Sequence, residues 1–405
     1  MSKVLLINQF FYPDVAPTGQ VATDLAEDLV RRGLEVSVLC SRRRYGGVGS
    51  LAWRETYQGI QIYRTGSTRY GRRRTLGRAL DYFSFYLTAG VKALVLPRYD
   101  LVICLSTPPL IAGLGVLLKW VKGSRYVYWV QDLYPDVAVA LGVLRKKGMV
   151  TGLVRHLSRL TLCRADAVVA LGEVMAEKLS ANGFRPKNLS VLPCWADGEE
   201  LRLVPHKMNP FIEEQGLSGK FIGLYSGNMG KGHELDTLLG AIEALREVED
   251  LLFVFIGDGA RRSEIERFQK TKGLQNLRLL PYQDRHRVCL SLNAGDVHLV
   301  TLREGLEGLL VASKIYSSLA TGKPVIYIGP ERSEVGEIVR RADCGYVHCP
   351  GDVEGVVRSV REMISRPEKR ERLGRNGRAY FEAHFERRQI TEKFYQVIRD
   401  VLSVA

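Results

Sequence analysis

The 405-residue chain lacks the residue patterns of several common protein classes. Its seven cysteines are scattered without a CxxC pair, which argues against a zinc site and favours free thiols in a reducing compartment. No GxGxxG follows a predicted strand, which disfavours a nicotinamide-dependent oxidoreductase, and no Walker GK[ST] loop occurs. The N-terminus, MSKVLLINQF, has one Lys and a very short apolar run, which predicts a first strand and no signal peptide.

Long uncharged runs are also scarce, and the one exception is interrupted. Residues 101–118 carry no charge, which is near the lower limit for a transmembrane helix. Pro108 and Pro109 split this run, and a double proline breaks a helix. We therefore expect a strand at 101–105, a turn, and a buried helix from about Leu110, in preference to a membrane span.

The composition is that of a globular protein with an uneven charge. Hydrophobic residues make up 46% and charged residues 25% of the chain, and its length suggests two domains. The first 200 residues carry 27 Lys and Arg against 16 Asp and Glu, whereas the remaining 205 carry 31 against 28. The basic first half indicates an anionic partner, which leaves nucleic acid, an acidic membrane surface and a phosphorylated substrate open.

Short apolar runs alternate with amphipathic helices along both halves, which predicts parallel sheets covered by helices on both faces. The expected strands lie at 4–7, 36–40, 60–63, 101–105, 126–130, 167–171, 189–192, 221–225, 251–256, 277–280, 297–300 and 325–328. The expected helices lie at 18–32, 76–96, 110–121, 149–163, 173–182, 235–246, 260–272, 313–321, 354–365 and 386–402. The polar segment 196–209 breaks this rhythm. We place domains at 1–195 and 196–385, followed by a C-terminal helix within 386–405.

Three glycine-containing loops each follow a predicted strand. Gly19 lies in YPDVAPTGQ, Gly227 and Lys231 lie in YSGNMGKGHEL, and Gly257 and Asp258 lie in IGDGARR. Glycine lets a backbone approach a ligand closely, Lys231 suits a phosphate, and Asp258 suits a sugar hydroxyl. Ordinary turns between strand and helix, with Asp258 capping the helix, remain the alternative.

The stretch 296–329 reads as strand, polar loop, helix, turn and strand. Ligands of open α/β sheets bind where such a loop joins the end of a parallel strand to a helix. Helix N-terminal N–H groups there suit a phosphate, and Lys314 in the first turn adds a full charge.

Two further motifs lie in the first half. In WVQDLYPD, at 129–136, Asp132 is a candidate active-site carboxylate among aromatic residues, and Asp136 is expected to cap a helix. Arg42–Arg44 and Arg72–Arg74 lie near Tyr45, Trp53 and Tyr70. Such arginine clusters suit nucleic acid, an anionic bilayer or simply a solvated loop.

Together these motifs resemble the retaining glycosyltransferases of the GT-B fold, in the bacterial group 1 (family 4) set, over nearly the whole chain. The strongest segments are YSGNMGKGHELDTLL, IGDGARR, LPYQDR and EGLEGLLVASKIYSSLATGKPVI. The branch it resembles includes polysaccharide transferases that add N-acetyl amino sugars. The resemblance implies an α/β protein with two Rossmann-like domains whose parallel sheets face each other across a cleft, and a C-terminal helix that returns to the first domain.

The resemblance also implies roles for particular residues. Gly19 matches the glycine loop of the first domain, while Gly227, Asn228 and Lys231 match the loop near the diphosphate. Tyr282 falls where the base is contacted, and Ser313 and Lys314 match a serine-lysine pair at the phosphates. Glu304 and Glu307 fall in the acidic loop near the donor sugar and ribose.

The chain departs from the family pattern at two places. A pair of glutamates with seven residues between them is replaced by Leu309 and Ser317. Either Glu304 or Glu307 takes over one role, or the donor is held differently. The histidine of the first-domain active site is also missing, and Asp132 is the nearest candidate for its role. His233 is expected to be a hydrogen-bonding loop residue and not a catalyst.

These observations predict a glycosyltransferase that moves a sugar from a nucleotide-diphosphate donor, with UDP as the expected carrier. We expect no cofactor and no metal, because no DxD pair is present. The expected acceptor is a glycan or a polyprenyl-diphosphate-linked molecule. The expected location is cytoplasmic and peripheral on the inner face of the plasma membrane, through Arg42–Arg44 and Arg72–Arg74. A sugar-nucleotide epimerase and a nucleic-acid-binding protein that uses the arginine loops are the alternatives, and no nucleic-acid partner is expected under the preferred reading.

Overall fold

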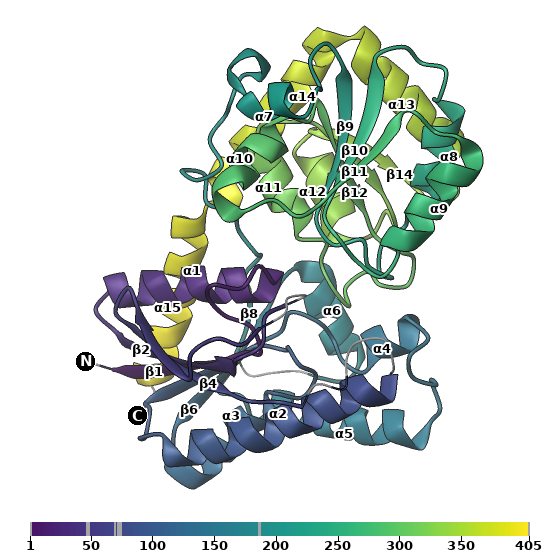
Figure 1. Cartoon of the computed structure of the whole chain (residues 1–405). Coiled ribbons are helices and arrows are strands. Elements are labelled where there is room, and N and C mark those ends of the chain that lie inside the picture. Colours follow the sequence, from purple (N-terminus) through teal and green to yellow (C-terminus); the bar gives the residue numbers. More distant parts are fainter. Residues whose placement is uncertain (1, 46–48, 69, 71–74, 185–187, 404–405) are drawn as a thin grey trace. The chain divides into compact units, whose positions relative to one another are not determined.

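A computed structural model describes residues 2–45, 49–68, 70, 75–184 and 188–403 of the chain. The chain forms two compact units, shown in Figure 1. Unit 1 comprises residues 1–193 together with 390–405, and unit 2 comprises residues 194–389. The boundaries lie two and four residues from the expected ones at 195 and 385.

Unit 1 contains an eight-stranded sheet in the order β3-β4-β2-β1-β5-β6-β7-β8. All neighbours are parallel except β3, which pairs antiparallel with β4 at the edge. The central strands β1, β2, β5, β6 and β7 are buried from their second residue onwards, as expected for a sheet covered on both faces. The strands are β1 (Lys3–Ile7), β2 (Glu35–Ser41), β3 (Arg54–Tyr57), β4 (Ile60–Thr65), β5 (Leu101–Cys104), β6 (Arg125–Trp129), β7 (Ala167–Ala170) and β8 (Leu189–Val191).

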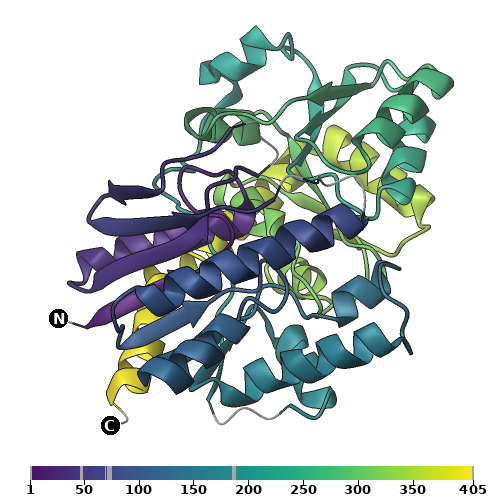
Figure 2. The same cartoon turned by 60° about the horizontal axis from the view of Figure 1, so that its bottom comes forward.

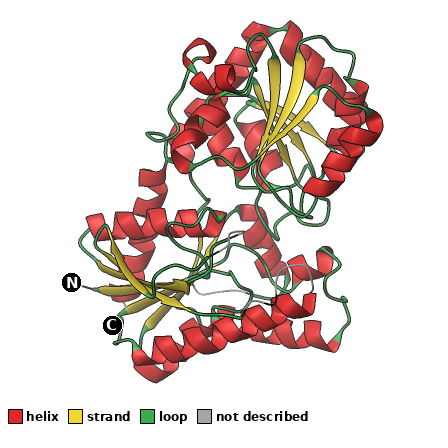
Figure 3. Cartoon of the chain, viewed as in Figure 1, coloured by secondary structure: helices red, strands yellow, loops and turns green. Residues whose placement is uncertain are grey.

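Helices cover both faces of this sheet (Figure 3). In Figure 1, α1 lies on one face, and α2, α3 and α5 lie on the other. The approach of α3 to β6 depends on Gly115, because a Cβ there would come within 2.3 Å of the Tyr126 ring. The helices within residues 2–184 are α1 (Pro17–Arg31), α2 (Thr75–Val95), α3 (Gly113–Lys122), α4 (Asp136–Ala140), α5 (Met149–Arg164) and α6 (Glu173–Ala181).

The C-terminal helix α15 (Arg387–Ser403) brings residues from Ile390 onwards into unit 1. Phe394 and Ile398 are fully buried, and the Phe394 ring meets Trp129 of β6 edge-to-face at 4.9 Å between centroids. The end of the chain therefore completes the core that the first 193 residues begin.

Unit 2 contains a six-stranded, wholly parallel sheet in the order β11-β10-β9-β12-β13-β14. Its strands are β9 (Phe221–Ser226), β10 (Leu251–Ile256), β11 (Leu277–Leu280), β12 (Val297–Thr301), β13 (Val325–Ile328) and β14 (Gly345–His348). Its helices are the 3₁₀ turn η1 (His206–Met208), α7 (Pro210–Glu214), α8 (Asp236–Ala244), α9 (Arg262–Lys272), α10 (Arg285–Asn293), α11 (Lys314–Ala320), α12 (Glu334–Arg341), α13 (Val353–Ser365) and α14 (Pro367–His384).

The predicted strands and helices are confirmed with small shifts at their ends. The uncharged run 101–118 is β5, a turn and the first half of α3, which begins at Gly113 and not at Leu110. The sequence did not predict β3, β14 or the helices α7, α10, α12 and α14, and it indicated α4 only through the cap expected at Asp136. In the described parts of the chain, no helix is both long and apolar enough to cross a membrane.

Candidate active site

The loops that follow β9 and β10 in unit 2 are bonded directly to each other. The N–H of Gly227 donates to the carbonyl of Ile256 at 2.8 Å, and the N–H of Met229 donates to the carbonyl of Asp258 at 2.7 Å. Both loops lie at the carboxyl ends of adjacent parallel strands, which is where open α/β sheets bind ligands. The two glycine motifs therefore form one backbone surface.

Glycine is required in these loops by their mutual contact. Gly227 and Gly257 have φ of 129° and 140°, a conformation that L side chains rarely adopt. A Cβ on Gly257 would lie 2.1 Å from the carbonyl oxygen of Gly227, and one on Gly227 would lie 2.8 Å from Cε of Lys314. The missing side chains let the loops and the lysine pack together, and contact with a donor through these glycines stays a prediction.

Lys314 is the first residue of α11, and its side chain extends to the β9 loop. Its Nζ lies 3.3 Å from the carbonyl oxygen of Asn228 and 3.0 Å from Nε2 of His233. It also lies 4.8 Å from the centroid of the Tyr225 ring, within cation–π distance. No ion pair with a carboxylate is found for Lys314 among the described residues, and the groups around its Nζ are a carbonyl, an imidazole and an aromatic ring.

Burial sets the protonation of both groups in this contact. Burial lowers the pKa of Lys314 from 10.5 to about 7. Burial, with the nearby Lys314 charge as the second cause, lowers the pKa of His233 to about 3. His233 is therefore neutral at pH 7. Its Nδ1 lies 2.8 Å from the carbonyl oxygen of Thr301, which assigns the proton to Nδ1 and leaves Nε2 to accept from Lys314.

The other predicted residues of the Lys314 loop have different environments. Ser313 precedes α11 and is exposed, without a side-chain capping bond. Ser317 donates to the carbonyl of Lys314 at 3.0 Å, so its hydroxyl is used within the helix. Glu304 is exposed. Glu307 is partly buried, and its Oε2 is enclosed without a hydrogen-bond partner.

The remaining predicted residues of unit 2 lie in the two glycine loops or in the loop after β11. Asn228 contributes its backbone carbonyl, which accepts from the Tyr225 hydroxyl at 2.9 Å and from Lys314. Lys231 is exposed. Asp258 is exposed and accepts from the N–H of Gly259 at 2.8 Å, and it caps no helix because Arg261 precedes α9. Tyr282, in the loop after β11, is 41% exposed.

Two predicted site residues belong to unit 1. Gly19 is buried in α1, where a Cβ would lie 3.2 Å from the backbone of Phe10, so its close contact is with the chain itself. Asp132 follows β6, and its N–H and that of Gln131 both donate to Ser106 Oγ, at 3.0 and 3.1 Å. Burial raises the pKa of Asp132 to about 6, which suits a group that exchanges a proton near neutral pH.

Asp136 is not the helix cap that the sequence suggested. Pro135 occupies the cap position of α4, without a side-chain capping bond, and Asp136 is the first helical residue. Its Oδ1 pairs instead with Arg155 of α5 at 3.1 Å.

The first arginine cluster is largely engaged within unit 1. Arg42 stacks on Trp53 at 3.9 Å and donates to the carbonyl of Leu51 at 2.7 Å. Arg43 pairs with Asp81 at 3.4 Å, and Arg44 is exposed. Arg72–Arg74 lie outside the described residues, and the membrane role of both clusters stays a prediction.

The contact of His233 with Lys314 is the feature that sequence reasoning missed. The hydrogen-bonding role expected for His233 is confirmed, but its partners are 68 and 81 residues away in the chain. Only the parallel order of β9 and β12 brings these loops together. No local spacing in the sequence encodes that pairing.

Comparison with known proteins covers both units. The model of the "Glycosyl transferase 4-like domain" matches residues 18–195, and that of "Glycosyl transferases group 1" matches residues 209–380. The probable glycosyltransferase WbjE of Pseudomonas aeruginosa is 29% identical over 324 residues, which cover 79% of this chain and 78% of WbjE. The putative colanic acid biosynthesis glycosyl transferase WcaI of Escherichia coli is 26% identical over 412 residues, which cover 98% of this chain and 100% of WcaI.

Solved structures share the fold at low sequence identity. A sucrose-phosphate synthase from Thermosynechococcus elongatus aligns over the full length of both chains, with a TM-score of 0.79 and 16% identity. Anabaena HepE in complex with UDP-glucose has a TM-score of 0.75 and 15% identity over 99% of this chain and 100% of its own. WaaG, a glycosyltransferase involved in lipopolysaccharide biosynthesis, has a TM-score of 0.72 and 16% identity over 99% and 100% of the two chains. With two α/β units, two matching family models and these relatives, the chain belongs to the group 1 glycosyltransferases of the GT-B fold.

Proposed function

We propose that this glycosyltransferase transfers a sugar from a UDP-sugar to a glycan or polyprenyl-diphosphate-linked acceptor in bacterial surface-polysaccharide biosynthesis. The Lys314 side chain, held beside the joined glycine loops of unit 2 without a carboxylate partner, carries the proposal. The names of WcaI and WaaG support the polysaccharide role, and the UDP-glucose complex of HepE supports the donor class.

The reaction needs positive charge where the leaving group becomes negative. The bond between the sugar C1 and the diphosphate oxygen breaks, a bond from C1 to an acceptor hydroxyl oxygen forms, and the hydroxyl proton is released. A diphosphate beside Lys314 favours its charged form, because an opposite charge raises the pKa that burial has lowered. Lys231 adds a second, exposed positive charge next to the same loop.

We further propose retention of the anomeric configuration, without a protein nucleophile and without a bound metal, at the cytoplasmic face of the membrane. In this scheme the positive charge of Lys314 and Lys231 does the work that a metal ion would do on the diphosphate. Asp132, whose pKa is raised to about 6, is the candidate group for the acceptor proton in unit 1.

The test is a transfer assay across UDP-, GDP- and dTDP-sugars, with lipid extract as the acceptor and nucleoside diphosphate release as the readout. Lys314→Ala is expected to lower turnover by about 100- to 1000-fold, the usual cost of removing one group that stabilises the transition state. Lys220→Ala is the matched control, because Lys220 precedes β9 at the opposite end of the strand and pairs with Asp250. Near-normal turnover of Lys314→Ala would contradict the role proposed for Lys314 at the diphosphate.

The same assay without acceptor separates transfer from epimerisation. A transferase leaves the sugar configuration of its donor unchanged, whereas an epimerase converts it. Unchanged turnover in EDTA is expected, and a loss restored by a divalent cation would contradict the metal-free mechanism.

A further inference from the structure

Helix α2 of unit 1 turns an apolar stripe toward solvent. Leu80, Phe83, Leu87, Val91 and Leu94 are between 43% and 64% exposed. They recur every three or four residues, which places them on one face of the helix. Phe85, Ala89 and Ala93 are buried on the other side. A helix that covers a sheet ordinarily presents polar residues to water, whereas no segment of the described residues covers this outward apolar stripe.

The outer faces of α3 and α5 extend the same surface. On α3, Trp120 and Val121 are 59% and 61% exposed. On α5, Met149, Leu153 and Leu157 are 94%, 60% and 37% exposed, again at four-residue spacing. Large apolar side chains such as these are usually buried in a core, but here they lie at the surface of neighbouring helices.

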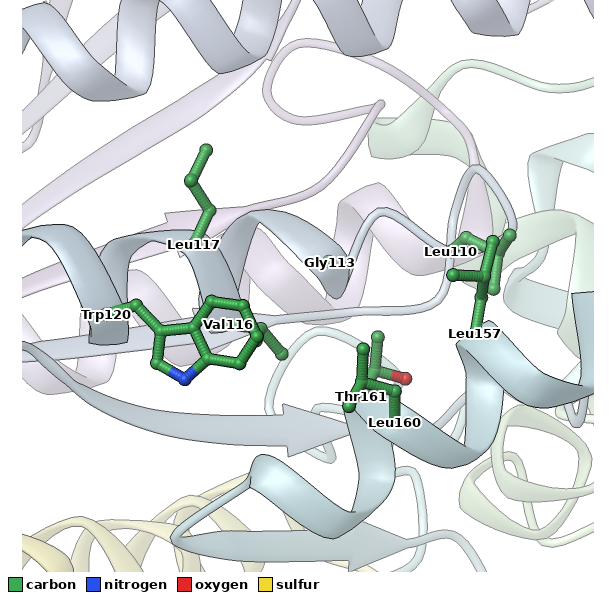
Figure 4. A pocket seen from close by; sticks show the side chains of 8 residues that line it. All are labelled: Leu110, Gly113, Val116, Leu117, Trp120, Leu157, Leu160 and Thr161. Atoms are coloured by element: carbon green, nitrogen blue, oxygen red, sulfur yellow. The ribbon is translucent and has the colours of Figure 1, made fainter.

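The three helices are neighbours on one face of the unit 1 sheet, as Figures 1 and 2 show. The Leu114 side chain of α3 fits against Gly90 of α2, at 3.6 Å from where its Cβ would be. Between α3 and α5 lies a groove of about 300 Å³, shown in Figure 4. Seven of its eight lining residues are apolar or glycine, with Thr161 as the exception. We call this surface the α2–α3–α5 face.

The chain that builds this face is strongly basic. Residues 75–165 contain twelve Lys and Arg and four acidic residues, of which Asp81 pairs with Arg43. Asp100 accepts from the N–H of Lys3, Asp136 pairs with Arg155, and Asp132 belongs to the candidate site. Arg145, Lys146 and Lys147 are exposed just before α5 begins. Exposed apolar side chains with an excess of basic over acidic residues are the chemistry of a surface that lies on an anionic bilayer.

We propose that the α2–α3–α5 face docks on an anionic phospholipid bilayer, with its apolar side chains in the boundary between headgroups and acyl chains. A second copy of the chain is a poorer occupant, because two such basic faces would repel each other. Docking needs neither donor nor acceptor, so it is tested independently of the proposed transfer reaction.

The first experiment is co-sedimentation with vesicles of phosphatidylcholine containing about 30% phosphatidylglycerol, at about 0.1 M salt. The variant Met149→Gln/Leu153→Gln is expected to bind at least tenfold more weakly than the unmodified chain, because it removes apolar groups from the interface. Met208→Gln/Leu203→Gln is the matched control, since these unit 2 residues are 74% and 57% exposed. Both pairs are surface residues, so the comparison does not depend on folding stability.

The second experiment changes charge alone. Replacing Arg145, Lys146 and Lys147 by Gln is expected to weaken binding on the order of 100-fold, since each cation near an anionic surface contributes about fivefold. The matched control replaces Arg341, Arg358 and Arg375, whose side chains are 67%, 72% and 71% exposed in unit 2. Weaker binding to pure phosphatidylcholine, and at about 0.5 M salt, is also expected.

Three results would overturn the proposal. One is the absence of vesicle binding by the unmodified chain. Another is binding that survives both α2–α3–α5 variants but is lost when Arg72–Arg74 are replaced by Ser. The third is a dimer in solution that Met149→Gln/Leu153→Gln dissociates, with no binding to vesicles.

Discussion

The ammonium of Lys314 lies 3.0 Å from Nε2 of His233, and the opposite ring nitrogen lies 2.8 Å from the carbonyl oxygen of Thr301. A neutral imidazole thus orients the lysine without cancelling its charge. A carboxylate in the same place would form an ion pair and compete with an incoming diphosphate. Lys314 therefore has no competing carboxylate and can gain its full charge when an anion binds beside it.

The first prediction concerns the pH dependence of donor use. Because burial lowers the pKa of Lys314 to about 7, the free enzyme loses this charge as pH rises through 7. We expect kcat/KM for the donor to fall about tenfold per pH unit above this point, since kcat/KM reports groups of the free enzyme. Lys314→Arg keeps its charge over this range, so its kcat/KM should not fall above pH 7. Identical profiles for the two proteins would contradict the role of Lys314.

The second prediction tests His233 as a positioning residue. His233→Ala leaves Lys314 without its acceptor and is expected to lower kcat/KM for the donor about tenfold, the usual size of one lost hydrogen bond to a charged group. His233→Gln offers a side-chain oxygen to the lysine and should recover part of the loss. We also expect kcat/KM of His233→Ala to begin its fall at a higher pH, because water replaces the ring, solvates the ammonium and raises the pKa of Lys314. If alanine and glutamine behave alike, the imidazole does not act through Lys314.

The third prediction concerns the joined glycine loops. Gly257→Ala would set a Cβ 2.1 Å from the carbonyl oxygen of Gly227 at a φ of 140°. We expect a loss of about 3 kcal/mol or more in the free energy of unfolding, because both the clash and the backbone conformation oppose it. Urea denaturation measures this loss.

Gly232→Ala is the control in the same loop, because its nearest atom is the flexible Leu306 Cδ1 at 3.3 Å. It should cost far less than Gly257→Ala. Equal effects of the two substitutions would show that the contact between the loops contributes little.

The fourth prediction concerns stability in acid. His298 of β12 is 2% exposed, and burial lowers its pKa to about 4. Between pH 6.5 and 4 the unfolded chain therefore binds a proton that the folded chain does not, so stability rises with pH and is lost as pH falls through this window. The full effect is about 3 kcal/mol.

Urea unfolding at pH 7 and pH 4.5 measures this change. His298→Asn should have a lower free energy of unfolding at pH 7, because the ring bonds to Ser318 and Leu292 are lost. Its difference between the two pH values should nevertheless be smaller than that of the unmodified chain. An unchanged difference would exclude His298 as a source of the acid sensitivity.

The sequence encodes the strands of both sheets clearly because the central strands are buried on both faces. Each therefore reads as a continuous apolar run, such as Leu251–Ile256. The edge strand β3 (Arg54–Tyr57) was missed because it is polar and half exposed. The helix α14 (Pro367–His384) was missed because its dense charge masks its four buried positions, Leu373, Gly374, Gly377 and Phe381.

The candidate site was likewise predicted from the sequence only in part. The sequence by itself determined the glycine loops, the position of Lys314 after a strand and the family of the chain, since these depend on residue types at short spacing. Only the tertiary structure decided that Gly257 packs on Gly227, that His233 holds Lys314, and that α2, α3 and α5 share one apolar face. These contacts join residues far apart in the chain, and the parallel order of the strands, which no local pattern specifies, sets which loops and helices meet.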